Sequence, residues 1–198
     1  MFAGNAGTNI ILGEVDTGID WTSSDFKNPD GTTRILNIWD QNVPGTPPAS
    51  FSYGTEWTAA QINAGTCTHH DIYGHGTHVM GTAAGNGSAT GNGQPAFQFM
   101  GMAPRADIIV VATDFTTASI LDGVNYIFQK AAAAGKNAVV NLSLGTQYGA
   151  HDGSEVFDTA IDAMTRLGLL GSIWRLRMTP TRIPLNSTLD PGTRPGTG

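Results

Sequence analysis

Three short apolar runs along the chain have the length and composition of buried β-strands. They span residues 9–15, 107–112 and 138–144, and each is rich in Ile, Val, Leu or Ala. Segments that are apolar at successive positions are typical of strands covered on both faces, as in a parallel sheet. We therefore expect these three segments to form the centre of one sheet.

Helical periodicity appears between and after these runs. One segment carries a single apolar stripe with a period of about 3.6 residues, formed by Ile120, Leu121, Val124, Ile127, Phe128 and Ala131. Ser119 and Asp122 resemble a capping box at its start, and Gly135 lies where a C-terminal cap belongs. Residues 74–85 predict a helix of small residues, and residues 156–164 predict another that closes near Gly168. The order of elements predicts an α/β fold, a parallel β-sheet flanked by helices.

Two stretches do not follow this pattern. Residues 21–66 are rich in Asn, Asp, Gly, Pro and Thr, and we interpret them as loops with one strand near residues 35–38. Residues 166–198 contain 1 acidic and 5 basic side chains, whereas residues 1–165 contain 15 acidic and 5 basic ones. Residues 174–178 alternate apolar and charged positions, which favours a half-exposed edge strand. We divide the chain into a domain over residues 1–165 and a divergent tail over residues 166–198.

Composition excludes several classes of protein. The length of 198 residues suits one domain with a real core. The formal charge of −6 argues against a nucleic-acid partner, whose binding site would be basic. The sequence has no run approaching the roughly 18 apolar residues of a membrane span, and its first residues do not resemble a signal peptide. The single cysteine, Cys67, excludes an internal disulfide.

Two short clusters could carry chemistry. Asp16, followed by Thr17 and Gly18, ends the first apolar run, and in open α/β sheets ligands bind at the carboxyl ends of the strands. His75 opens the helix of small residues, where an imidazole is held at a defined place. A carboxylate that accepts from one ring nitrogen fixes the tautomer, so the other nitrogen can act as a general base. Taken singly, Asp16 could be only a turn former.

The other histidines suggest less. His75 and His78 have the spacing of a metal-binding pair on a helix, but no third ligand follows at a sensible spacing, and we assign no metal site. His69 and His70 lie in a polar loop, and we expect both of them to be solvated.

Four motifs in one order are far more specific than either cluster. Asp-Thr-Gly-Ile-Asp at residues 16–20 is followed by Gly-His-Gly-Thr-His-Val at 74–79, Gly-Met-Ala-Pro at 101–104 and Asn-Leu-Ser-Leu-Gly at 141–145. From about residue 10 to residue 165, the chain resembles the subtilisin-like (subtilase) serine proteases. This resemblance implies that Asp16 and His75 are catalytic residues of a serine endopeptidase. It also implies that the backbone of Ser143, Leu144 and Gly145 binds an extended peptide as an added strand.

The sequence departs from the family pattern in three places. It contains no Gly-Thr-Ser-Met-Ala-like stretch for the nucleophilic serine, and no Ala-Gly-Asn after the helix that ends near Thr165. Glu14 stands where the family has an apolar residue, and a carboxylate inside a strand is costly unless it is paired. We interpret the tail as the product of a shifted reading frame, a truncation or a fusion. The alternative to an active protease is therefore an impaired or inactive fragment that binds peptides or takes part in an assembly.

Further expectations follow from the resemblance alone. It implies a peptide or protein substrate, an extracellular location and no required cofactor. Structural calcium is common in the family, and Asp20, Asp25 and Asp30 could contribute to such a site, but acids in loops are more often only solvated and we assign no site. We expect the fold to be incomplete on its C-terminal side, with a sheet edge that the tail or a second copy of the chain covers as a homo-oligomer.

Overall fold

The computed structural model describes residues 6–145, 152–166 and 171–175, and this part contains both strands and helices. The strands are β1 (Ile10–Asp16), β2 (Ile35–Asp40), β3 (Thr55–Thr58), β4 (Asp107–Ala112), β5 (Asn137–Leu142) and β6 (Gly171–Arg175). The helices are α1 (Ala59–Asn63), α2 (His75–Ala84), α3 (Thr117–Ala133) and α4 (Val156–Arg166), with a 3₁₀ turn, η1, at Ser24–Phe26.

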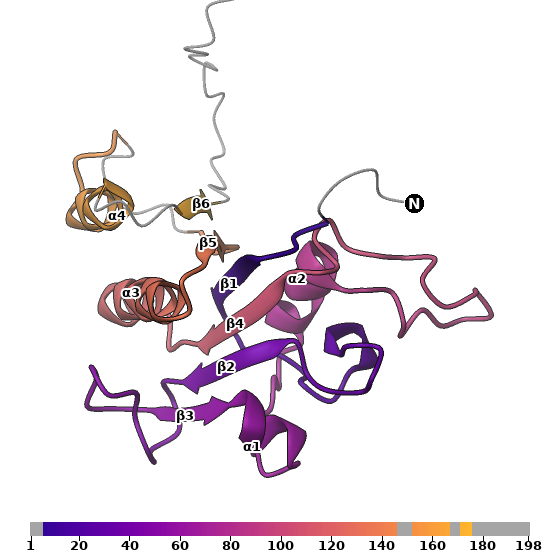
Figure 1. Ribbon diagram of the computed structural model, residues 1–198. Coiled ribbons are helices and arrows are strands. Elements are labelled where there is room, and N and C mark those ends of the chain that lie inside the picture. The colour runs from indigo at the N-terminus through magenta and orange to yellow at the C-terminus, as the bar shows by residue number, and fades with distance from the viewer. Residues whose placement is uncertain (1–5, 146–151, 167–170, 176–198) are drawn as a thin grey trace, which may run out of the picture.

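The six strands form one sheet in the order β3-β2-β4-β1-β5-β6 (Figure 1). All neighbouring pairs are parallel except β2 and β3, which are antiparallel. The predicted α/β fold with a parallel sheet is confirmed, with β3 as an antiparallel addition at one edge. Strand β1 lies between β4 and β5, so the direction in which the sheet is built reverses next to it. Ligand crevices form at such switch points, outside the carboxyl ends of the strands.

Helices cover both faces of the sheet (Figure 1). The hydrophobic core therefore consists of two clusters, one on each face. On the α3 face, Ile11 and Val15 of β1 pack with side chains of α3, including Val124 and Ile127. On the α2 face, Met80 and Ala84 of α2 pack with residues of β2 and β4. Because successive strand side chains point to opposite faces, Leu12, Glu14 and Asp16 of β1 face α2.

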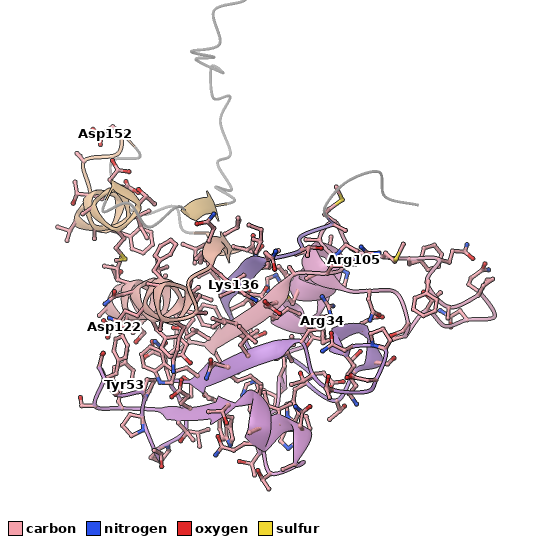
Figure 2. All side chains as sticks on the ribbon, in the orientation of Figure 1. Arg34, Tyr53, Arg105, Asp122, Lys136 and Asp152 are labelled. Atoms are coloured by element: carbon pink, nitrogen blue, oxygen red, sulfur yellow. The ribbon has the colours of Figure 1, made fainter. Side chains whose placement is uncertain are left out.

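The longest helix packs very closely on β1 because a glycine faces it. A Cβ atom at Gly13 would lie only 2.5 Å from Cγ2 of Ile127. The loop between β2 and β3 is attached to the same helix, since the Tyr53 hydroxyl donates to Asp122 Oδ2 at 2.8 Å (Figure 2). Burial, followed by the hydrogen bond to Asp122, raises the pKa of Tyr53 to about 12. Helix α3 is thus fixed to both the centre and one edge of the sheet.

Several sequence predictions differ from the observed elements. Residues 21–66 contain two strands, β2 and β3, and the helix α1, where we predicted loops and one strand. Thr58 and Gln61 form the capping box of α1. The helix has only five residues, so it shows no clear helical periodicity in the sequence. Helix α3 begins earlier than predicted, because the cap is Thr116, whose hydroxyl accepts from the Ser119 N–H at 3.3 Å. At the other end the cap residue is Ala134, one position before the predicted Gly135, which follows it with φ 64°.

Strand β6 follows helix α4 in the chain and lies next to β5 at the edge of the sheet. It pairs in parallel with β5, from Ala138 opposite Gly171 to Leu142 opposite Arg175. It starts earlier than the alternating segment in which we predicted an edge strand, and residues 176–198 lie outside the described residues. Among the helices of the described residues, none is long and apolar enough to cross a membrane.

Glu14 is fully buried in the middle of the sheet, with 0% of its surface exposed. Within the described part of the chain, neither carboxyl oxygen has a hydrogen-bond partner. Burial first, and then the negative charges of Asp16 and Asp71, raise the pKa of Glu14 well above its usual value. The pairing that would offset the cost of a buried charge is absent among the described residues, and the strand face that carries Glu14 is buried. The raised pKa favours the protonated form of Glu14, which avoids this cost.

The close packing at Gly13 can be tested by adding one methyl group. We expect Gly13→Ala to lower the free energy of unfolding by about 1–3 kcal/mol, because the new Cβ overlaps Ile127. Gly81→Ala is the matched control, since a Cβ at this position in α2 meets nothing within 4 Å. It should raise stability by about 0.5–1 kcal/mol. Urea unfolding measures both values, and equal effects of the two substitutions would contradict the prediction.

The raised pKa of Glu14 gives stability a defined pH dependence. A folded-state pKa above the ordinary glutamate value means that the folded chain holds a proton that the unfolded chain releases as the pH rises. Stability is then fully present below the unfolded pKa and falls at higher pH, by up to about 1.4 kcal/mol per pH unit. Glu14→Gln cannot titrate, so its free energy of unfolding should rise relative to wild type between pH 4 and pH 7. A difference that stays constant over this range, measured by urea unfolding, would show that Glu14 is not buried as an acid.

Candidate active site

Asp16 and His75 meet at the carboxyl end of β1, although 59 positions separate them in the sequence. Asp16 is the last residue of β1, and His75 is the first residue of α2. The distance from His75 Nδ1 to Asp16 Oδ1 is 2.7 Å. The Asp16 side chain is 0% exposed and that of His75 is 54% exposed. The structure thus brings together the two side chains that the sequence analysis singled out.

This geometry determines what each ring nitrogen of His75 can do. A carboxylate accepts hydrogen bonds, so Nδ1 carries a proton and donates it to Asp16. In a neutral ring the lone pair is then on Nε2, and the side chain that carries it is half-exposed. Asp16 Oδ1 also accepts from the Thr17 N–H at 2.7 Å, which fixes the carboxylate itself. An imidazole oriented by a buried carboxylate can take a proton from a hydroxyl group and hold the resulting positive charge.

The turn after Asp16 is fixed against the start of α2. The Gly76 N–H donates to Thr17 Oγ1 at 2.8 Å, and the Asp20 N–H donates to Thr77 Oγ1 at 2.8 Å. No larger residue than glycine fits at position 76, because a Cβ there would lie 2.2 Å from the Gly18 carbonyl oxygen. The small residues of the His75 motif therefore set how closely helix and turn approach each other.

Asp71 holds the first turn of α2, a role that the sequence analysis missed. The N-cap residue is Gly74, which has no side chain to accept from the free N–H groups. Asp71 accepts instead from the Gly74 N–H at 2.9 Å, and from the Thr77 N–H at 2.9 Å and hydroxyl at 2.6 Å. Burial raises the pKa of Asp71, but these hydrogen bonds outweigh it, so the pKa lies below its usual value. The sequence signal that could have revealed this role is an acid shortly before a helix that has glycine at its N-cap position.

Ser143, Leu144 and Gly145 follow directly after β5, at the same edge of the sheet as Asp16. Ser143 and Leu144 are half-buried and Gly145 is exposed. The Ser143 hydroxyl accepts from Asn141 Nδ2 at 2.9 Å. The backbone of this segment lies where a ligand at the switch point could reach it.

His69 is not solvated, and our expectation for it was wrong. Its side chain is 1% exposed, and Nδ1 lies 2.7 Å from Asp40 Oδ2. The expectation rested on the polar residues around it, but the loop folds back beneath the turn after Asp16, where Ile19 donates its N–H to His69 Nε2 at 3.2 Å. His70 and His78 are exposed.

The three acids considered for calcium do not converge on one site. Asp20 and Asp30 each accept from the N–H and hydroxyl of a threonine two residues later, and Asp25 accepts from the Ala89 N–H at 2.8 Å. In the described ranges there is no group of three or more His, Cys, Asp or Glu side chains that could hold a metal ion. These carboxylates stabilise separate turns, so their arrangement does not fit a shared calcium ion.

Comparison with known proteins finds curated relatives that are subtilisin-like proteases. The chain is 31% identical over 152 residues to subtilisin-like protease 4 of Trichophyton equinum, an alignment that covers 73% of this chain and 28% of the relative. The Trichophyton rubrum protein of the same name gives the same values. The chain therefore spans under a third of the length of these curated relatives.

Solved structures give the same result for the fold. The Clostridium perfringens CspB protease matches with a TM-score of 0.71 and 29% identity, over 86% of this chain and 36% of that one. Sphericase matches with a TM-score of 0.55 and 23% identity, over 89% of this chain and 47% of that one. The Subtilase family model matches residues 7–173, eight residues beyond the point where we divided the sequence. With most of its length matched and the fold shared, the chain belongs to the subtilase family of serine proteases.

Proposed function

We propose that this chain provides the aspartate and histidine of a subtilisin-type serine endopeptidase. Asp16 orients the His75 ring and stabilises its protonated form, and His75 Nε2 takes the proton of a nucleophilic serine hydroxyl. The observation that carries this proposal is the 2.7 Å contact between a buried carboxylate and a half-exposed imidazole at the switch point of the sheet. The serine itself is not identifiable in the 198 residues.

We further propose that the substrate is a peptide bound in extended form along residues 143–145. The segment continues from β5 with exposed or half-buried residues at the edge that holds Asp16. An extended peptide can pair with such backbone as an additional strand, which gives affinity with little demand on the peptide's sequence. An extracellular location is part of the same proposal and rests on the family resemblance.

A second candidate function is binding of peptides without cleavage. It is favoured by one observation, the absence of a Gly-Thr-Ser-Met-Ala-like stretch in the sequence. Asp16 and His75 act as a unit with a nucleophile, so without one they would retain little of their effect on rate.

An active-site-directed fluorophosphonate separates the two functions. For a protease, we expect one serine to be labelled stoichiometrically, Asp16→Asn to slow labelling by about 10⁴-fold, and His75→Ala to abolish it. His78→Ala is the matched control, an exposed histidine one turn further along α2, and it should leave labelling unchanged. Absence of labelling together with measurable affinity for peptides, by isothermal titration, would instead support the binding function.

The sheet edge formed by β6 provides a test of assembly. In the part of the chain that the structure describes, β6 pairs with β5 on one side only. An uncovered parallel edge readily pairs with another chain, so we propose that a second copy covers it. Sedimentation equilibrium should then show a mass above that of the 20.7 kDa chain. A strictly monomeric species at micromolar concentration would contradict this proposal.

A further inference from the structure

A second Asp–His pair lies, like Asp16 and His75, at the carboxyl ends of the parallel strands. Asp16 ends β1 and Asp40 ends β2, and both pair in register with Ala112 of the strand between them, β4. In each pair, a histidine Nδ1 lies 2.7 Å from a carboxylate oxygen. The difference is exposure, since His75 is 54% exposed and His69 only 1%.

Both ring nitrogens of His69 are occupied by protein groups. Nε2 accepts from the Ile19 N–H at 3.2 Å, so it carries no proton. The proton of the neutral ring is therefore on Nδ1 and is donated to Asp40. Burial raises the pKa of Asp40, but hydrogen bonds from His69 and from the Asn42 N–H outweigh it, and the pKa is lowered. His69 has no free nitrogen with which to act as a base.

The group that His69 holds is the turn that begins with Asp16. Ile19 lies three residues after Asp16, and the turn is bonded on its other side to α2 through Thr17 and Asp20. Gly18, at φ 123°, approaches the ring so closely that a Cβ would lie 2.3 Å from His69 Nε2. The turn is thus enclosed between the helix that carries His75 and the ring of His69.

We propose that Asp40 and His69 form a positioning pair that sets the place of the Asp16 turn relative to His75. Asp40 fixes the tautomer of His69, His69 accepts from Ile19, and the turn so held presents Asp16 to His75 Nδ1. Neither residue of the pair touches the reacting atoms. The inference rests on the proposed function, because the Asp16–His75 arrangement that the pair maintains is the proposed catalytic arrangement.

The isosteric change Asp40→Asn breaks this chain of hydrogen bonds without removing volume. Asp40 accepts at both oxygens, from Asn42 N–H at 2.9 Å through Oδ1 and from His69 through Oδ2. An amide can accept at only one of these positions, so one bond is lost or the His69 tautomer is reversed, which turns Nε2 into a second donor facing the Ile19 N–H. Either outcome removes a bond that positions the turn.

Proton NMR of the ¹⁵N-labelled chain tests the proposal. In wild type we expect two strongly deshielded Nδ1–H signals, one from each Asp–His pair. In Asp40→Asn the His69 signal should be lost, the His75 signal should shift or disappear, and the Ile19 amide should exchange about tenfold faster. Asp107→Asn is the matched control, because Asp107 lies at the opposite end of β4, where its partner is Lys136. It should leave both signals unchanged.

The outcomes are separable from those of the proposed function. A folded Asp40→Asn variant with an unchanged His75 signal overturns the positioning role, even if the fluorophosphonate labels a serine. Loss of the His75 signal without serine labelling supports the positioning role and removes the proposed protease activity. If Asp40→Asn does not fold, ring ¹⁵N shifts of wild-type His69 decide, and protonation at Nε2 instead of Nδ1 overturns the proposal.

Discussion

The hydrogen bond between Asp16 and His75 is the interaction on which the rest of the site depends. It joins a carboxylate with no exposed surface to a ring that is half open to solvent, over 2.7 Å. A buried carboxylate needs hydrogen-bond donors, and Asp16 Oδ1 receives two, from His75 and from the Thr17 N–H, whereas Oδ2 has none among the described residues. The same contacts that stabilise the charge therefore define the orientation of the imidazole.

This interaction requires a helix and a turn to approach each other at van der Waals distance. Glycine at position 76 allows the approach, and the hydrogen bonds of Thr17 and Thr77 fix its register. Asp71 keeps the first turn of α2 ordered where a glycine N-cap supplies no acceptor. Most residues of these motifs therefore serve to position Asp16 and His75 and do not react themselves.

The sequence predicts the layers of this fold well and its polar contacts unevenly. Apolar runs locate β1, β4 and β5, and one helical stripe locates α3, because burial leaves a clear pattern along the sequence. Strand β3 and helix α1 are short and lie at an edge, where the pattern is weak. Asp16 and His75 are found through their motifs. The burial of His69 is not, because it depends on a loop that folds beneath a turn 50 residues away.

Three acids at or near one edge of the sheet show how differently burial can be accommodated. Asp16 and Asp40 each lie against a histidine that donates to them. Glu14 lies on the same face of β1 as Asp16 and has no donor among the described residues, and burial followed by the charge of Asp16 raises its pKa. Two ionised carboxylates two residues apart on one buried strand face would repel each other, and the charge of Asp16 contributes to the raised pKa of Glu14. The two acids are therefore accommodated by different means, Asp16 by hydrogen bonds and Glu14 by a raised pKa that favours its uncharged form.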